Sequence, residues 1–192
     1  MNDLFDEYNH IVCGIDEAGR GPLAGPVVAA CVLLDSAHII PGLDDSKKLS
    51  AAKREALFAE IVHRASRVGL GYATHQEIDR TDIRQATLCA MLRAFEHAGI
   101  PGAAVIGIDG RDTMPGLLNR QMAIIGGDGK VPAIGAASIV AKVMRDWLME
   151  SFDAIYPGYG FSSHKGYGTK AHFEAIRRQG MVTIHRRTFI HL

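Results

Sequence analysis

An apolar run that ends in an acid beside glycine occurs three times, and it is the feature that most constrains the fold of this chain. The runs are IVCGIDEAG, AAVIGIDG and MAIIGGDG, and their acids are Asp16 with Glu17, Asp109, and Asp128. Short runs of this kind, bounded by turn residues, are typical of buried strands. A strand presents its last side chains at the edge of its sheet, so acids from neighbouring strands can meet there. The pattern predicts a buried sheet with several carboxylates at one edge.

The remaining chain alternates strand patterns with amphipathic helix patterns. We predict strands at residues 11–16, 27–34, 67–74, 104–109 and 122–125. We predict helices at about 50–65, 82–98, 136–152 and 170–179, the first capped by Ser50 and the second stopped by Gly99 and Pro101. The early strands follow one another closely, helices separate the later ones, and no linker or repeat interrupts the chain. This order predicts one mixed α/β domain over residues 1–192.

Two of these helices have apolar stripes that predict which side chains enter the core. The first helix would bury Ala56, Leu57, Phe58, Ile61 and Val62, and the third would bury Ile139, Val140, Val143 and Trp147. We also assign Phe95, in the second helix, to the core.

Composition limits the class of protein. The chain has 192 residues, of which 47% are hydrophobic and 22% charged, so it is long and apolar enough to bury its own core. Lys plus Arg number 21 and Asp plus Glu number 21, so net charge argues neither for nor against a polyanionic partner.

The cysteines and the N-terminus point to the cytoplasm. Cys13, Cys31 and Cys89 are odd in number and widely spaced, which disfavours both a disulfide framework and a zinc ribbon. The start, MNDLFDEYNH, has acids where a signal peptide has basic residues, and no apolar run reaches the roughly 18 residues of a membrane span. We expect a cytoplasmic protein without a membrane segment.

Carboxylates that meet at a sheet edge require a cation. At about 4 Å and an effective dielectric of about 20, each pair of like charges costs about 4 kcal/mol, unless a cation or a raised pKa removes the repulsion. Oxygen ligands without a matching set of His or Cys favour Mg²⁺ or Mn²⁺. The alternative is that each Asp only starts a turn, which is common before glycine. Adjacent Asp16 and Glu17 favour the metal site, because a second acid adds nothing to a turn.

The glycine-rich loop at residues 19–25 follows the first strand, as a dinucleotide-binding loop would. Two preceding acids would repel a pyrophosphate, and Pro22 removes a backbone donor. The segment after the loop also looks like a strand, whereas a dinucleotide site needs a helix there. Gly19 and Gly21 would instead let the main chain approach a sugar-phosphate closely, with Arg20 available to pair with a phosphate. A tight turn without further function is the alternative.

Two other polar segments could bind nucleic acid. Ser46 and Lys47 precede a predicted helix N-terminus, a position that suits an anion, although helix capping explains a serine there equally well. His164, Lys165 and Tyr167 lie in a glycine-rich loop and offer an imidazole, a cation and a ring that could stack on a base. A surface loop can carry such residues without a function. For the tail HRRTF, an ordinary basic terminus is the simpler interpretation.

Six segments together carry a resemblance to a known family. They are IVCGIDEAGRGPLAGPVVAA, DSKKLS, VIGIDG, GAASIVAKVMRD, HKGYGT and HRRTF, and in this order they resemble bacterial ribonuclease HII, from about Ile11 to Phe189. The resemblance implies a ribonuclease H-like fold, a central mixed β-sheet flanked by helices with a C-terminal helical segment. It also implies Mg²⁺- or Mn²⁺-dependent hydrolysis of RNA paired with DNA, and incision at single ribonucleotides embedded in duplex DNA.

The same resemblance implies roles for individual residues. Asp16, Glu17 and Asp109 would be metal ligands, and Asp128 would complete the catalytic acids. Recognition of the ribose 2′-hydroxyl would fall to Gly19, Arg20, Gly21 and Tyr167. The contacts to the nucleic-acid backbone would come from Ser46, Lys47, His164, Lys165 and Arg186. The family usually has Lys two residues before the fourth acid, and here that position is Gly126, so a positive charge near Asp128 is missing.

These roles give a mechanistic hypothesis. Water would attack the phosphorus on the 5′ side of the ribonucleotide with the help of two metal ions, giving 5′-phosphate and 3′-hydroxyl ends. The 2′-hydroxyl would serve for recognition and not as the nucleophile. The expected partners are RNA–DNA hybrid and ribonucleotide-containing duplex DNA, and we expect a monomer.

Two alternatives differ from this hypothesis in class. Type III ribonucleases H have an additional N-terminal domain, for which the ten residues before Ile11 leave no room. The chain could also be a non-catalytic binder of hybrid duplexes whose acids only make turns. The presence of Asp16, Glu17 and Asp109 argues against the binder.

Overall fold

A computed structural model describes residues 12–35, 40–43, 46, 49–102 and 104–191. Lys47, one of the predicted backbone contacts, lies outside the described residues. Among the described residues, no helix is both long enough and apolar enough to cross a membrane.

Five strands form one mixed sheet in the order β3-β2-β1-β4-β5. They are β1 (Cys13–Ala18), β2 (Val27–Leu33), β3 (Arg67–Ala73), β4 (Ile106–Asp109) and β5 (Gln121–Ile124). The first three pair antiparallel, whereas β4 is parallel to β1 and β5 is parallel to β4. The predicted mixed sheet is therefore confirmed, and all five predicted strands are present within a few residues of their expected bounds.

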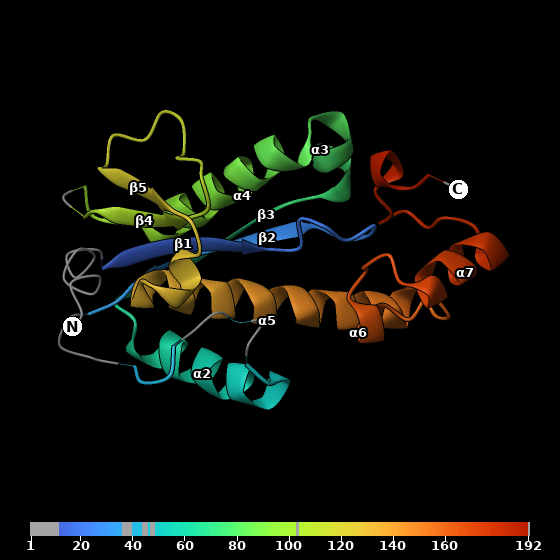
Figure 1. Ribbon diagram of the computed structural model, residues 1–192, viewed down its shortest axis with the longest axis horizontal. Coiled ribbons are helices and arrows are strands. Elements are labelled where there is room, and N and C mark those ends of the chain that lie inside the picture. Colours follow the sequence, from blue (N-terminus) through green and yellow to red (C-terminus); the bar gives the residue numbers. More distant parts are fainter. Residues whose placement is uncertain (1–11, 36–39, 44–45, 47–48, 103, 192) are drawn as a thin grey trace.

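Helices cover both faces of this sheet (Figure 1). One face carries α4 (Ile83–Ala98), while the other carries α5 (Pro132–Ile155), with α2 (Ala51–Arg64) packed outside α5. The far end of α5 meets α6 (Phe161–His164) and α7 (Lys170–Gln179). Alternation along β2 explains this layering, because Ala29 and Cys31 join the core under α4 while Ala30 and Val32 join the core under α5.

Glycines in the strands let the helices approach the sheet closely. A Cβ at Gly69 would lie 2.1 Å from the Ala94 carbonyl oxygen, and one at Gly71 would lie 2.2 Å from that of Ala90. The backbone of α4 therefore packs directly on β3, at a distance that any larger residue at these two positions would prevent.

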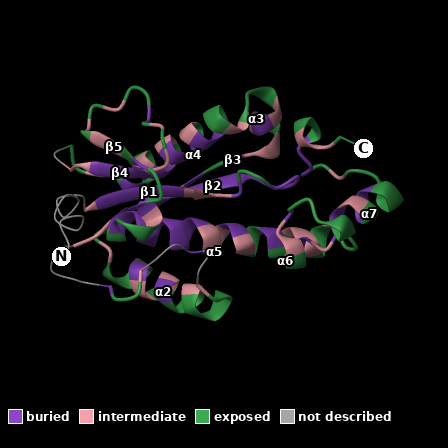
Figure 2. Cartoon of the chain, in the orientation of Figure 1, coloured by how far each residue is buried: buried purple, intermediate pink, exposed green. Residues whose placement is uncertain are grey.

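Some helical predictions need correction. α3 (His75–Arg80) and the short α6 were not predicted, and α5 begins at Pro132 instead of 136, because proline fits the first turn of a helix. Trp147 was predicted to be buried but is 42% exposed, with its ring packed edge-on against Phe58 at 5.1 Å between centroids. Val62 is likewise 51% exposed. Figure 2 shows exposed and buried stretches alternating along α2.

These misplaced side chains share one cause. α2 packs mainly on α5, and only Leu57 and Ile61 of its apolar stripe are buried, in the core between α5 and the sheet. Two 3₁₀ turns complete the fold, η1 (Gly127–Gly129) after β5 and η2 (Arg187–Phe189) near the C-terminus.

Candidate active site

The predicted acids lie on neighbouring strands. Asp16 and Glu17 are in β1, and Asp109 is the last residue of β4. Ile15 pairs with Ile108 in the parallel register, so Asp16 and Asp109 follow one step further along adjacent strands. Asp16 is buried, whereas Glu17 and Asp109 are half-buried. The sheet therefore gathers acids that are about ninety residues apart in the chain.

Burial and mutual repulsion act on these carboxyls together. Burial raises the pKa of Asp16 well above its ordinary value, and the neighbouring charges of Glu17 and Asp109 raise it further. A hydrogen bond from Ser138 and one from the Glu17 amide, 2.7 Å from Oδ1, oppose that rise. Burial also raises the pKa of Glu17, against the opposing effect of Arg20, whose Nη1 lies 3.5 Å from Glu17 Oε1.

The fourth acid is attached to the same end of the sheet through η1. Asp109 Oδ1 accepts a hydrogen bond of 2.8 Å from the Gly127 amide, which fixes the start of this turn beside β4. Asp128 follows directly, and its Oδ1 accepts from the Gly129 amide at 3.0 Å. Its carboxylate is thus held near Asp109 by the backbone.

The presence of glycine at position 126, where the family usually has lysine, has a local explanation. This residue has a φ of 64°, in the left-handed region that favours glycine. The cation of this turn is instead Lys130, whose Nζ donates a 2.6 Å hydrogen bond to the Ile125 carbonyl. A positive charge is therefore present two residues after Asp128, although the predicted position lacks one.

The acid end suits a hard divalent cation in its chemistry. Asp16, Glu17 and Asp109 offer only oxygen donors, and their mutual repulsion is what such a cation would relieve. Within the described part of the chain, however, no group of three or more acid, His or Cys side chains has the arrangement of a ready-made metal site. By its chemistry, the oxygen-only donor set nevertheless fits such a cation.

Two buried arginines hold the glycine-rich loop beside these acids. Arg186 is fully buried and donates to the carbonyls of Gly19 at 2.6 Å, Arg20 at 2.8 Å and Gly25 at 2.9 Å. Contact of Arg186 with a nucleic-acid backbone stays a prediction, and it requires these bonds to open, whereas the interpretation of the tail as an ordinary basic terminus is wrong because Arg186 and His185 are buried. Burial lowers the pKa of Arg186 to about 9, still well above neutrality.

The second arginine, Arg145 in α5, was missed by the sequence analysis. It donates to the carbonyls of Pro26 at 3.1 Å, Lys165 at 2.9 Å and Ala24 at 3.2 Å. A Cβ at Gly19 would lie 1.9 Å from its Nε, so the guanidinium occupies the space that glycine leaves. A charged residue within an apolar helical stripe was the available signal.

Tyr167 lies against the glycine-rich loop, and its role in recognising a 2′-hydroxyl stays a prediction. Its ring is 45% exposed, and its Cε1 lies 3.7 Å from where a Cβ on Gly21 would be. The Leu23 amide also donates to the Gly166 carbonyl at 2.8 Å. Exposed Arg20, exposed Gly21 and the Tyr167 ring therefore form one surface next to the acids, which we call the recognition surface.

His164 and Lys165 are engaged within the protein. His164 Nε2 lies 2.8 Å from the Tyr159 carbonyl, and its Nδ1 accepts from the Gly166 amide at 3.2 Å. The Lys165 ammonium pairs with Glu150 at 2.7 Å. Contact of these side chains with a nucleic-acid backbone stays a prediction, and it requires these bonds to open.

Ser46 is not a surface contact. It is 3% exposed, and its hydroxyl lies 3.0 Å from that of Ser138, which in turn hydrogen-bonds Asp16. Contact of Ser46 with a nucleic-acid backbone stays a prediction, and in this structure its hydroxyl is occupied inside the protein. Ser138, in α5, was missed, although a serine in an apolar helix was the signal.

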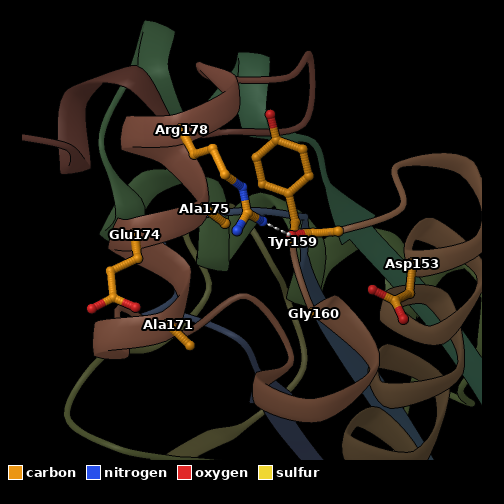
Figure 3. Close-up of a pocket in the computed structure, with 8 residues that line it drawn as sticks. Asp153, Tyr159, Gly160, Ala171, Glu174, Ala175 and Arg178 are labelled. Carbon is orange, nitrogen blue, oxygen red and sulfur yellow. Dashed lines mark hydrogen bonds between the residues drawn. The ribbon is translucent and has the colours of Figure 1, made fainter.

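A separate surface pocket lies at the C-terminal end of α5. It is lined by residues of α5, of α7 and of the segment around 158–160, including Asp153, Tyr159 and Arg178 (Figure 3). Arg178 reaches over to the Gly158 carbonyl at 3.3 Å. Neither the acids nor the recognition surface lines it.

Comparison with known proteins supports this description. Residues 13–192 match the family model for ribonuclease HII. The ribonuclease HII of Coxiella burnetii is 51% identical over 181 residues, covering 94% of this chain and 89% of that protein. The ribonuclease HII of Burkholderia pseudomallei is 53% identical over 186 residues, covering 96% and 86%.

Solved structures show the same fold. Ribonuclease H2 from Pyrococcus horikoshii matches with a TM-score of 0.76 and 28% identity, covering 92% of each chain. The ribonuclease HII of Archaeoglobus fulgidus, solved in a complex with PCNA, matches with a TM-score of 0.78 and 26% identity, covering 94% of this chain and 95% of that one.

Proposed function

The chain belongs to the ribonuclease HII family, and we propose that it hydrolyses the RNA strand of RNA–DNA hybrids and incises duplex DNA 5′ of single embedded ribonucleotides. The observation that carries this proposal is the contact between the acids and the recognition surface. Arg20 pairs with Glu17 at 3.5 Å, and the neighbouring Gly21 faces Tyr167. A phosphodiester at the acids would therefore present its sugar to this surface.

Asp16, Glu17 and Asp109 would hold Mg²⁺ or Mn²⁺. When bound, such ions neutralise phosphate charge and lower the pKa of water. In the proposed reaction a bond forms between the water oxygen and the phosphorus, and the bond from phosphorus to the preceding 3′-oxygen breaks. The water loses a proton and the 3′-oxygen gains one, which gives 5′-phosphate and 3′-hydroxyl ends.

The recognition surface would distinguish ribose from deoxyribose. Arg186 holds the carbonyls of Gly19 and Arg20, so the backbone of this loop is fixed before substrate arrives. A rigid backbone beside an exposed aromatic ring suits a 2′-hydroxyl, which both donates and accepts hydrogen bonds. We propose that Gly21 and Tyr167 contact the sugar that carries it.

A non-catalytic binder of hybrid duplexes is the second candidate. In that case the acids would be turn residues facing water. Instead, Asp16 is buried in a strand and its pKa is raised by two neighbouring carboxylates, an arrangement that costs stability unless a ligand uses it. This observation favours the enzyme.

The test uses the purified full chain and three duplexes: all-DNA, DNA with one ribonucleotide, and an RNA–DNA hybrid. We expect nicking of the last two with Mg²⁺ or Mn²⁺ and none with a chelator, with 5′-phosphate ends. Binding of these duplexes without nicking in either metal would overturn the proposal. The variant Asp109→Asn removes one of the acids and is expected to lose nicking. Asp112→Asn is its matched control, because Asp112 forms a surface pair with Arg84.

A further inference from the structure

Two histidines from separate segments meet in the protein interior. His172 lies in the first turn of α7, and His185 precedes η2. They are 0% and 2% exposed, and their Nε2 atoms are 3.1 Å apart. The rings of Tyr159 and Phe161 pack around them, and the His164 ring stacks on His172 at 4.5 Å.

The partners of these rings define where their protons lie. His172 Nδ1 lies 2.9 Å from the Tyr167 carbonyl, which only accepts, so the proton of a neutral ring is on Nδ1 and Nε2 is bare. His185 Nδ1 lies 2.9 Å from the Val182 amide, which donates, and 3.2 Å from the Val182 carbonyl, which accepts, and the shorter contact favours a bare Nδ1 with the proton on Nε2. His185 therefore donates an N–H···N hydrogen bond to His172.

With both rings neutral, the two Nε2 atoms form one donor and one acceptor, and His185 Nδ1 accepts from the Val182 amide. Burial lowers the pKa of His172 to about 4, and burial also lowers the pKa of His185. A second proton on either ring would either place two donors opposite each other or remove the acceptor for the Val182 amide. At neutral pH the pair is therefore matched, with one donor and one acceptor.

The pair connects the two halves of the recognition surface. On one side, His172 holds the main-chain carbonyl of Tyr167. On the other, His185 forms a β-bridge with Ala24 and is followed by Arg186, which holds the carbonyls of Gly19 and Arg20. The histidine pair thus adds one buried side-chain connection between the loop at 19–25 and the loop at 164–168, beside the Leu23–Gly166 backbone bond and the bonds from Arg145 to Ala24 and Lys165.

We infer that His172 and His185 are positioning residues for ribonucleotide recognition, because their hydrogen bond sets the Tyr167 ring relative to Gly19, Arg20 and Gly21. The inference rests on the proposed function of the recognition surface. It goes beyond that function by assigning the alignment of that surface to two side chains that do not themselves face the nucleic acid.

The first experiment measures the bond itself, in the full unmodified chain. Long-range ¹H–¹⁵N spectra of the imidazoles are expected to show a bare Nε2 on His172 and a protonated Nε2 on His185. A scalar coupling across the N–H···N bond is expected between the two Nε2 atoms. Protonation of His172 at Nε2, or absence of the coupling at neutral pH, would overturn the inference, whatever the enzyme cleaves.

The second experiment measures discrimination. Duplex DNA with one ribonucleotide and the all-DNA duplex are bound to the folded protein in chelator, and the ratio of the two affinities is compared between variants. His172→Asn retains a donor that can bond the Tyr167 carbonyl but does not reach His185, so the ratio is expected to fall about fivefold to tenfold, the loss typical of one hydrogen bond. His185→Gln keeps an N–H donor near the Nε2 position, and we expect it to retain the ratio within about twofold.

His97→Gln is the histidine control, because this side chain bonds Leu70 of β3 far from the recognition surface. A merely structural pair would lower the thermal midpoint of His172→Asn and leave the affinity ratio of the folded protein at the wild-type value, and that result would refute the inference. If the wild type shows no difference between the duplexes, the proposed ribonucleotide recognition fails instead, while the spectra still test the hydrogen bond.

Discussion

The acids at the end of β1 and the glycine-rich loop at residues 19–25 are only a few residues apart in the chain, yet buried charge has opposite effects on stability in these two regions. At the acid end, Asp16 and Glu17 have raised pKa values because they are buried and lie close to other carboxylates. In the loop, the buried guanidiniums of Arg145 and Arg186 each donate to three carbonyls. In the first region burial and repulsion cost stability that a bound cation would restore, and in the second buried charges hold the loop through hydrogen bonds.

Asp109→Asn tests the acid end and should have the largest effect. Asparagine can still accept the Gly127 amide, so the fold is kept, and removing one negative charge relieves the repulsion on Asp16 and Glu17. We expect nicking to fall by about a thousandfold or more, equivalent to about 4 kcal/mol in the barrier. Thermal unfolding should be unchanged or slightly higher, and near-normal cleavage would remove Asp109 from the site.

Arg186→Met tests the loop. It removes three hydrogen bonds and leaves buried carbonyls without their donor, so we expect the free energy of unfolding in urea to fall by about 3 to 5 kcal/mol. Arg187→Met is the control, because the side chain of Arg187 is exposed and its amide, not its guanidinium, bonds Asp79. Equal stability of the two variants would contradict the conclusion that the hydrogen bonds of Arg186 stabilise the loop.

Lowering the pH has opposite effects on the folding stability of the two regions. A folded-state pKa of about 4 for His172, below the ordinary 6.5, means that the unfolded chain binds the extra proton first, so stability falls as pH drops from about 6.5 to 4. The full shift corresponds to about 3 kcal/mol. The raised carboxyl pKa values act oppositely, since protonation at low pH stabilises the folded acid end.

Urea unfolding measured at steps between pH 4 and 7 checks this expectation. His172→Asn should flatten the loss of stability across this range, because its side chain does not titrate. An equally steep loss in the variant would assign the pH dependence to other groups.

Gly21→Ala should have the smallest effect on folding. An added Cβ would lie 3.7 Å from the Tyr167 ring, an ordinary contact, so we expect stability to change by less than about 1 kcal/mol. Affinity for the ribonucleotide-containing duplex should fall by about tenfold, because the methyl group occupies the surface that faces the sugar. Unchanged affinity, measured in chelator, would place the sugar elsewhere.

The local pattern of the sequence was sufficient for much of the fold. Apolar runs bounded by turn residues located every strand, and amphipathic periodicity with Ser50 as a cap located α2. The acids at the ends of apolar runs were found for the same reason, because strand geometry is local.

Which face of a helix is covered, and by what, depended on the tertiary structure. The stripe of α5 predicted Trp147 inside, but α2 covers only part of that face. Arg186 and His185 looked like a basic tail, and Ser46 like a surface hydroxyl, yet all three are buried.

The sequence by itself therefore determined the strands, the longer helices, the acids and the family resemblance, since each depends on short contiguous segments. The tertiary structure decided which charged side chains face solvent and which hold the backbone. The reason is that the bond between Arg186 and the Gly19 carbonyl joins residues 167 positions apart. Such a contact exists only once the sheet, α5 and the C-terminal segment have packed together.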